Sequence, residues 1–176
     1  MDGVYVYNNV VYKNGNDGIL VYDWGLTGRP NPPSPLPAAR NIHVFNNTVY
    51  KNAQIRNWYG GIAIDHKFAT SIFIRNNLTF GNPSNIRRYN VPTGTVIDNN
   101  IETSGLVKNA DSGDFSLIAG SSALDTGSTN IPFSLNFDFN NTPRPFGSRL
   151  DVGAFEYVFI PAPVIVPTSG QGTTET

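Results

Sequence analysis

Two adjacent asparagines recur four times in the first hundred residues, each time between short strand-like runs. The stretch "NIHVFNNTVYKN" (41–52) has close copies upstream, "GVYVYNNVVYKN", and downstream, "SIFIRNNLTFGN". The second asparagine of each pair is Asn9, Asn47, Asn77 or Asn100, which gives spacings of 38, 30 and 23 residues. Repetition of one short unit is typical of a solenoid, in which each unit contacts only its neighbours.

Two insertions explain why the first two spacings exceed 23 residues. Segment 25–40, "GLTGRPNPPSPLPAAR", is rich in proline, which cannot continue a central strand. Segment 53–60, "AQIRNWYG", lengthens the next turn. Insertions confined to turns leave the strands unchanged, which favours a solenoid of about four coils.

Each unit contains three short runs that we expect to form strands. The first runs are 4–7, 42–45, 72–75 and 95–98, the second are 10–12, 48–50, 78–80 and 101–103, and the third are 18–23, 61–66 and 85–90. Alternate side chains of a strand face opposite sides of its sheet. One face of the first strands therefore carries the aliphatic residues Val4, Val6, Ile42, Val44, Ile72 and Ile74. The outward face carries Tyr5, His43 and Phe73, which we interpret as surface residues.

The asparagines themselves are interpreted as structural residues. A sharp turn between two strands requires a left-handed residue, and asparagine tolerates this conformation better than most non-glycine residues. Its amide both donates and accepts, so stacked asparagines would form a ladder of hydrogen bonds along the solenoid. We expect Asn14, Asn52 and Asn82 to form a second ladder at the next turn.

The composition excludes several classes of function. Only 14% of the residues are charged and the net charge is −1, so we expect no nucleic-acid partner. No run approaches the length of a membrane span, so we expect no membrane insertion. The absence of cysteine excludes disulfides and thiolate metal sites. The 17 glycines and 13 prolines leave almost no segment with a helical period, which favours an all-β chain. Because the chain opens inside a repeat, we expect it to be part of a longer protein.

The "NNTVYKN" and "GIAI" units resemble repeats of the right-handed parallel β-helix, the pectate-lyase-like fold. A second resemblance covers Asp114 to Tyr157, where "DFSLIAGSSALDTG" and "DFNNTPRPFGSRLDVGAFEY" are similar to the C-terminal signature of many secreted bacterial β-helix proteins. The chain departs from that signature at Ser122, which replaces a proline, and at Phe155, which replaces a tyrosine. The resemblance implies an extracellular or cell-surface protein of bacterial origin, which we expect to be a monomer.

These patterns divide the chain into three parts. Residues 1–110 are expected to form the β-helix coils, 111–158 a cap that closes the end of the solenoid, and 159–176 a disordered linker or tail. Within the cap, buried Arg144 is expected to pair with Asp151 or Glu156. A calcium site among these carboxylates stays open as an alternative, although no residue is assigned to a metal.

In the resembling family, polysaccharide lies across the sheet that the third strands form. The residues that this implies as substrate-binding are Tyr22, Trp24, Trp58, Tyr59, Arg87 and Tyr89. The residues that it implies as catalytic are Asp23, Asp65, His66, Lys67 and Arg56. Aromatic faces stack on sugar rings, and alternation predicts that Tyr22, Asp65 and Tyr89 face outward as one row.

Three functions fit this set of residues. A lyase acting on a uronic acid needs a base, for which Lys67, His66 and Tyr22 are candidates, and a cation such as Arg56 beside the substrate carboxylate. A glycoside hydrolase needs two facing carboxyl groups, and Asp23 with Asp65 is the available pair. The third function is a non-catalytic adhesin or glycan-binding scaffold on the cell surface.

Overall fold

The computed structural model describes residues 2–22, 39–55 and 59–160, and these residues form an all-β protein with three parallel sheets. Sheet A contains β1 (Asp2–Tyr7), β4 (Arg40–Phe45), β7 (Thr70–Arg75) and β10 (Val96–Asp98) in that order. Sheet B contains β2 (Val10–Tyr12), β5 (Thr48–Tyr50) and β8 (Leu78–Phe80). Sheet C contains β3 (Ile19–Tyr22), β6 (Ile62–Asp65) and β9 (Ile86–Asn90).

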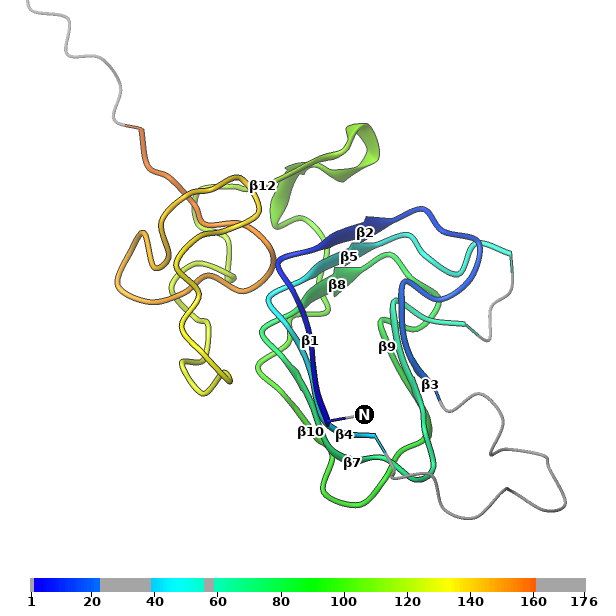
Figure 1. Cartoon of the computed structure of the whole chain (residues 1–176). Helices are drawn as coiled ribbons and strands as arrows, with labels where there is room; N and C mark the ends of the chain where they lie inside the picture. The colour runs from blue at the N-terminus through cyan, green and yellow to red at the C-terminus, as the bar shows by residue number, and fades with distance from the viewer. Residues whose placement is uncertain (1, 23–38, 56–58, 161–176) are drawn as a thin grey trace, which may run out of the picture.

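Each of the first three units thus contributes one strand to each sheet, which confirms the strand predictions for these units, whereas the fourth unit adds a strand to sheet A alone. In the fourth unit, the strand expected at 101–103 is reduced to a single bridge between Leu78 and Ile101. Figure 1 shows the three sheets arranged around a common interior. Among the described residues, none belongs to a helix long and apolar enough to cross a membrane.

The interior between the sheets is filled by aliphatic side chains. Sheet A aligns Val4 with Ile42 and Ile42 with Ile72, as expected from the period-two pattern. The fully buried aliphatic residues of this core include Val44, Val49, Ile62, Ile64, Ile72 and Ile74. Their burial is the main force that holds the sheets together, since apolar surface is removed from water at each level of the stack.

The asparagine pairs occupy the turns between sheets A and B. The first asparagine of each pair has a positive φ, from 51° to 56° at Asn8, Asn46, Asn76 and Asn99. The second forms a ladder in which each side-chain oxygen accepts from the asparagine of the preceding unit, as between Asn9, Asn47, Asn77 and Asn100. The second ladder joins Asn14, Asn52 and Asn82 and is also confirmed.

The C-terminal segment lies along these turns. It contains β11 (Val107–Asn109), the short 3-10 helix η1 (Ala110–Ser112) and β12 (Asp114–Leu117), followed by irregular chain (Figure 1). The first asparagines of all four pairs donate to its carbonyls: Asn8 to Phe137, Asn46 to Asp151, Asn76 to Ser128 and Asn99 to Thr126. The segment therefore contacts every unit of the stack from the side. The capping role expected for 111–158 stays a prediction.

A buried charge cluster fixes the end of this segment. Arg144 and Glu156 pair at 3.4 Å between Nη1 and Oε1, and both side chains are almost fully buried. The sequence left Asp151 and Glu156 open as partners, and the pair forms with Glu156. Asp151 instead accepts the backbone N–H groups of Asp125 and Tyr157, while its own carbonyl accepts from Arg144. Burial raises the pKa of Asp151 and of Glu156 above their ordinary values.

Candidate functional site

The strands of sheet C carry four of the residues that the sequence singled out: Tyr22, Asp65, Arg87 and Tyr89. Tyr22 lies at the end of β3, opposite Asp65 at the end of β6. Two positions earlier, Leu20 pairs with Ala63, and Ala63 pairs with Arg87 on β9. The parallel register brings these side chains together because equivalent positions of adjacent strands lie about 4.8 Å apart.

The expected row of Tyr22, Asp65 and Tyr89 is wrong at its third member. The register between β6 and β9 shifts after Ile64, so Asp65 pairs with Asn90 and Tyr89 falls within a bulge. The physical reason is Arg88, which pairs with Ile64 at an inward position but is exposed. Burial of an unpaired guanidinium in an aliphatic core is very costly, and a bulge bends the strand so that the charge reaches water.

Asp65, His66 and Lys67 follow one another at the end of β6, and their contacts differ. The Asp65 carboxylate accepts a hydrogen bond from the Asn90 side-chain amide at 2.6 Å. The buried His66 ring accepts the backbone N–H of Ala69 at its Nδ1 atom. The Lys67 side chain is exposed, with its ammonium 5.7 Å from the centre of the Phe68 ring.

The geometry of His66 limits what it can do as a base. A neutral imidazole whose Nδ1 accepts a hydrogen bond carries its proton on Nε2, so Nε2 is a donor. His66 and Tyr22 line one recess of about 270 Å³, whose other walls are aliphatic residues such as Val6 and Val21. With Nδ1 occupied by the Ala69 N–H, this atom is not available to take a proton from a substrate.

Half-buried Arg87 and exposed Tyr89 lie in contact on β9. The Arg87 guanidinium lies 5.0 Å from the centre of the Tyr89 ring, which is within the range of a cation–π contact. Tyr89 is 67% exposed and Tyr22 is 37% exposed. Tyr59, which is half-buried, precedes β6 at the same end of sheet C as the start of β9.

Sequence reasoning missed Asp17, which lies two residues before β3. Its carboxylate accepts the backbone N–H of Gly60 at 2.6 Å, and burial raises its pKa above the ordinary value. Arg87 lowers that pKa and Asp65 raises it, so both side chains lie close enough to act on the Asp17 carboxylate. A Cβ added at Gly60 would lie 2.9 Å from the Arg87 Cβ, and this close approach is what brings Arg87 near Asp17. The only signal in the sequence was the "NDGIL" turn before the strand.

Four of the expected site residues, Asp23, Trp24, Arg56 and Trp58, lie outside the described residues. The hydrolase pair of Asp23 with Asp65 and the lyase cation Arg56 are therefore not placed. Within the described ranges, no group of three or more His, Cys, Asp or Glu side chains is arranged to hold a metal ion.

Comparison of the chain with protein-family models, with curated proteins and with solved structures gave no match. The pectate-lyase-like resemblance thus stays an expectation, and a proposal for function depends on the residues of sheet C.

Proposed function

We propose that the chain is a right-handed parallel β-helix of about four coils that binds an acidic polysaccharide across the outward face of sheet C. The stacking order of the three sheets supports the solenoid, because each of the first three units adds one strand to every sheet. The proposal places the protein outside the cell, where such polysaccharides occur, and treats it as a monomer.

The contact between Arg87 and Tyr89 carries this proposal. It presents a half-buried guanidinium beside an exposed aromatic ring on β9. A guanidinium pairs with the carboxylate of a uronate, while the ring packs against the apolar face of a sugar. Lys67, two residues beyond β6, and Arg88 on β9 are exposed and add positive charge near this contact. An acidic glycan fits this combination better than a neutral one does.

This face is compatible with glycan binding alone and also with glycoside hydrolysis. One observation favours hydrolysis. Burial raises the pKa of Asp17, and the nearby Asp65 carboxylate raises it further. Two carboxyl groups in different environments are what an acid and its partner require. A lyase that uses Lys67 as its base is the remaining catalytic alternative.

The binding proposal is tested by calorimetric titration of the chain with oligogalacturonate. We expect Arg87→Gln to weaken binding about tenfold, as loss of one charge-assisted contact would, and Tyr89→Ala to weaken it comparably. Added salt should weaken the wild-type complex, since exposed charges are screened. The matched controls are Lys108→Gln on β11 and Tyr12→Ala on β2, which should leave the affinity unchanged.

Equal losses in the control variants, or no heat of binding with the wild type, would show that sheet C is not the binding face. Catalysis has separate readouts. Release of reducing ends that disappears in Asp17→Asn identifies a hydrolase, whereas absorbance from an unsaturated uronate that disappears in Lys67→Ala identifies a lyase. Binding without either product identifies the scaffold.

A further inference from the structure

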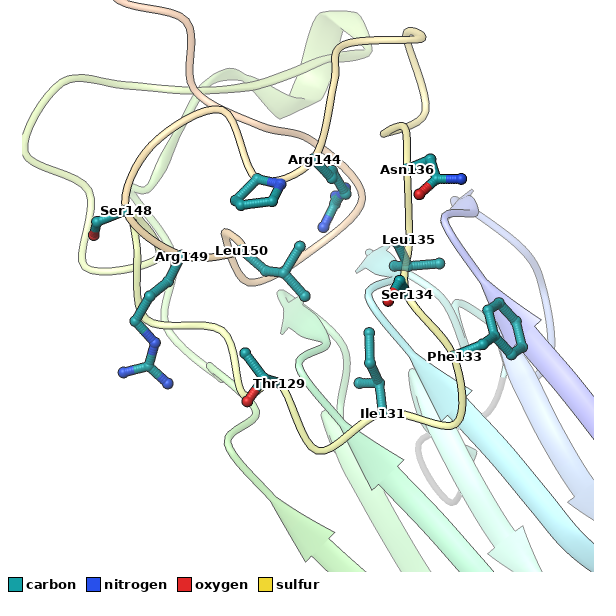
Figure 2. Close-up of a pocket in the computed structure, with 11 residues that line it drawn as sticks. Thr129, Ile131, Phe133, Ser134, Leu135, Asn136, Arg144, Ser148, Arg149 and Leu150 are labelled. Atoms are coloured by element: carbon teal, nitrogen blue, oxygen red, sulfur yellow. The ribbon is translucent and has the colours of Figure 1, made fainter.

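The C-terminal segment contains a recess of its own, distant in sequence from sheet C. Its volume is about 490 Å³, and its walls come from two stretches of irregular chain, 129–136 and 144–150 (Figure 2). Backbone hydrogen bonds hold these stretches in place, from Arg144 to Asn136 at 2.9 Å and from Gly127 to Leu150 at 2.7 Å. A volume in the range of about 300–1,000 Å³ is typical of sites for small ligands.

The floor of the recess is aliphatic. Figure 2 shows Ile131, Leu135 and Leu150 directed toward one another between the two stretches. Leu135 and Leu150 are buried, so the floor is anchored in the segment. Such a floor offers dispersion contacts to the C–H face of a ligand but no hydrogen bonds.

The rim provides the hydrogen-bonding groups. Thr129, Ser134 and Asn136 are exposed, and within the described residues none of their side chains makes a hydrogen bond. Arg149 donates from Nη2 to the Gly127 carbonyl at 2.9 Å, which holds its side chain at the edge of the recess. The rim therefore combines two hydroxyls, an amide and a guanidinium around an apolar floor.

The charges at this recess are balanced. The backbone N–H of Arg149 donates to the Asp125 carboxylate at 2.8 Å, and this hydrogen bond is the main reason why the pKa of Asp125 lies below its ordinary value. Arg144, the other cation of the lining, pairs with Glu156. The Arg144 guanidinium thus has its own carboxylate, and the Asp125 carboxylate, whose pKa Arg149 also lowers electrostatically, offsets the Arg149 charge, so an anionic ligand would gain little here.

We propose that this recess is a binding site for an uncharged pyranose unit. The C–H face of the sugar would pack on Leu135 and Leu150, and its hydroxyls would exchange hydrogen bonds with Thr129, Ser134 and Asn136. This site is separate from the acidic-glycan face of sheet C and does not depend on it. The two sites would select opposite ligands, because sheet C carries unbalanced positive charge and the recess does not.

The test is a titration of the whole, isotope-labelled chain with the methyl glycosides of glucose, galactose, mannose and N-acetylglucosamine, followed by amide chemical shifts. We expect at least one to shift the amides of Thr129, Ser134 and Asn136 with a dissociation constant on the order of millimolar. The methyl glycoside of glucuronate should bind more weakly than that of glucose. The double variant Thr129→Val with Asn136→Ala should weaken binding about tenfold, a loss of two hydrogen bonds.

The matched control is Thr103→Val with Asn140→Ala, exposed residues that do not line the recess. It should bind as the wild type does. No shift at the recess with any of the four neutral glycosides overturns the proposal, and so does glucuronate that binds as tightly as glucose. Neither result bears on oligogalacturonate binding at sheet C, so the two proposals fail independently.

Discussion

The side-chain oxygen of Asn77 accepts two hydrogen bonds from Asn47, one from the backbone N–H at 3.1 Å and one from the side-chain amide at 2.9 Å. Both residues are fully buried. The same pair of bonds links Asn9 to Asn47 and Asn77 to Asn100. Each asparagine oxygen of the ladder therefore accepts hydrogen bonds from both a backbone N–H and a side-chain amide of the preceding unit. These bonds connect each turn to the next.

Asn77→Ala should lower the free energy of unfolding by about 3 kcal/mol or more, because several buried groups lose their partners together. The carbonyls of Val44 and Arg75 would lose a donor, and the amides of Asn47 would lose their acceptor. Urea denaturation measures the change. Asn140→Ala removes an exposed amide outside the ladder and should change stability by less than about 0.5 kcal/mol. A similar loss in both variants would contradict a special role for the ladder.

Ser71→Gly should stabilise the protein by about 0.5 kcal/mol, because Ser71 has a φ of 57°. Glycine adopts this left-handed conformation without strain, which outweighs its greater freedom in the unfolded chain. The comparison is Ser104→Gly, at an exposed position without a positive φ, which should lower stability by a few tenths of a kcal/mol. The prediction is wrong if thermal unfolding shows the same sign of change in both variants.

Glu156→Gln should lower the free energy of unfolding by about 3 kcal/mol, since it leaves the buried Arg144 without its closest carboxylate. The two Glu156 oxygens accept the backbone N–H groups of Phe146 and Asp151, and a glutamine provides only one such oxygen. Hydrogen exchange should therefore accelerate at one of these two amides. Glu102→Gln, at an exposed position, is the control and should leave both amides protected.

Asp17→Asn should gain stability relative to the wild type as the pH rises above 3.8, the ordinary pKa of the carboxyl group. Burial raises the pKa of Asp17 in the folded state, so the unfolded chain ionises first and the wild type loses stability until the folded pKa is passed. Below 3.8 the group is neutral in both states and the difference vanishes. The asparagine oxygen can still accept from Gly60.

Unfolding measured in urea at a series of pH values follows this difference. Arg87 lowers the pKa of Asp17, so in an Arg87→Gln background the gain from Asp17→Asn should be larger. A stability difference that stays constant with pH, or that falls as the pH rises, would falsify the burial of Asp17 as its cause.

The alternation of Val4, Ile42 and Ile72 with polar or aromatic neighbours was enough to predict sheet A and its inward face. Strand period is a local property, and each strand expresses it independently of the others. The bulge after Ile64 was only partly foreseeable. An arginine at an inward position is incompatible with an aliphatic interior. Whether the strand then bends or shifts its register depends on the residues that surround the guanidinium.

Other contacts had no local signal at all. The Asp17 carboxylate accepts a hydrogen bond from the Gly60 N–H, and the Phe137 carbonyl accepts one from the Asn8 side chain. Both hydrogen bonds join residues that are distant in the chain. The choice of Glu156 over Asp151 as the partner of Arg144 also depended on which carboxylate was already occupied by backbone N–H groups.

The sequence by itself determined the strands, the asparagine ladders and the inward aliphatic faces, because these follow from turn conformation and side-chain alternation repeated at each unit. Tertiary structure decided the course of the C-terminal segment along the asparagine turns, the recess between 129–136 and 144–150, and the meeting of Asp17 with Arg87. These features arise where chain segments without a shared period pack against one another. Their positions are set by burial and hydrogen-bond satisfaction across the whole molecule.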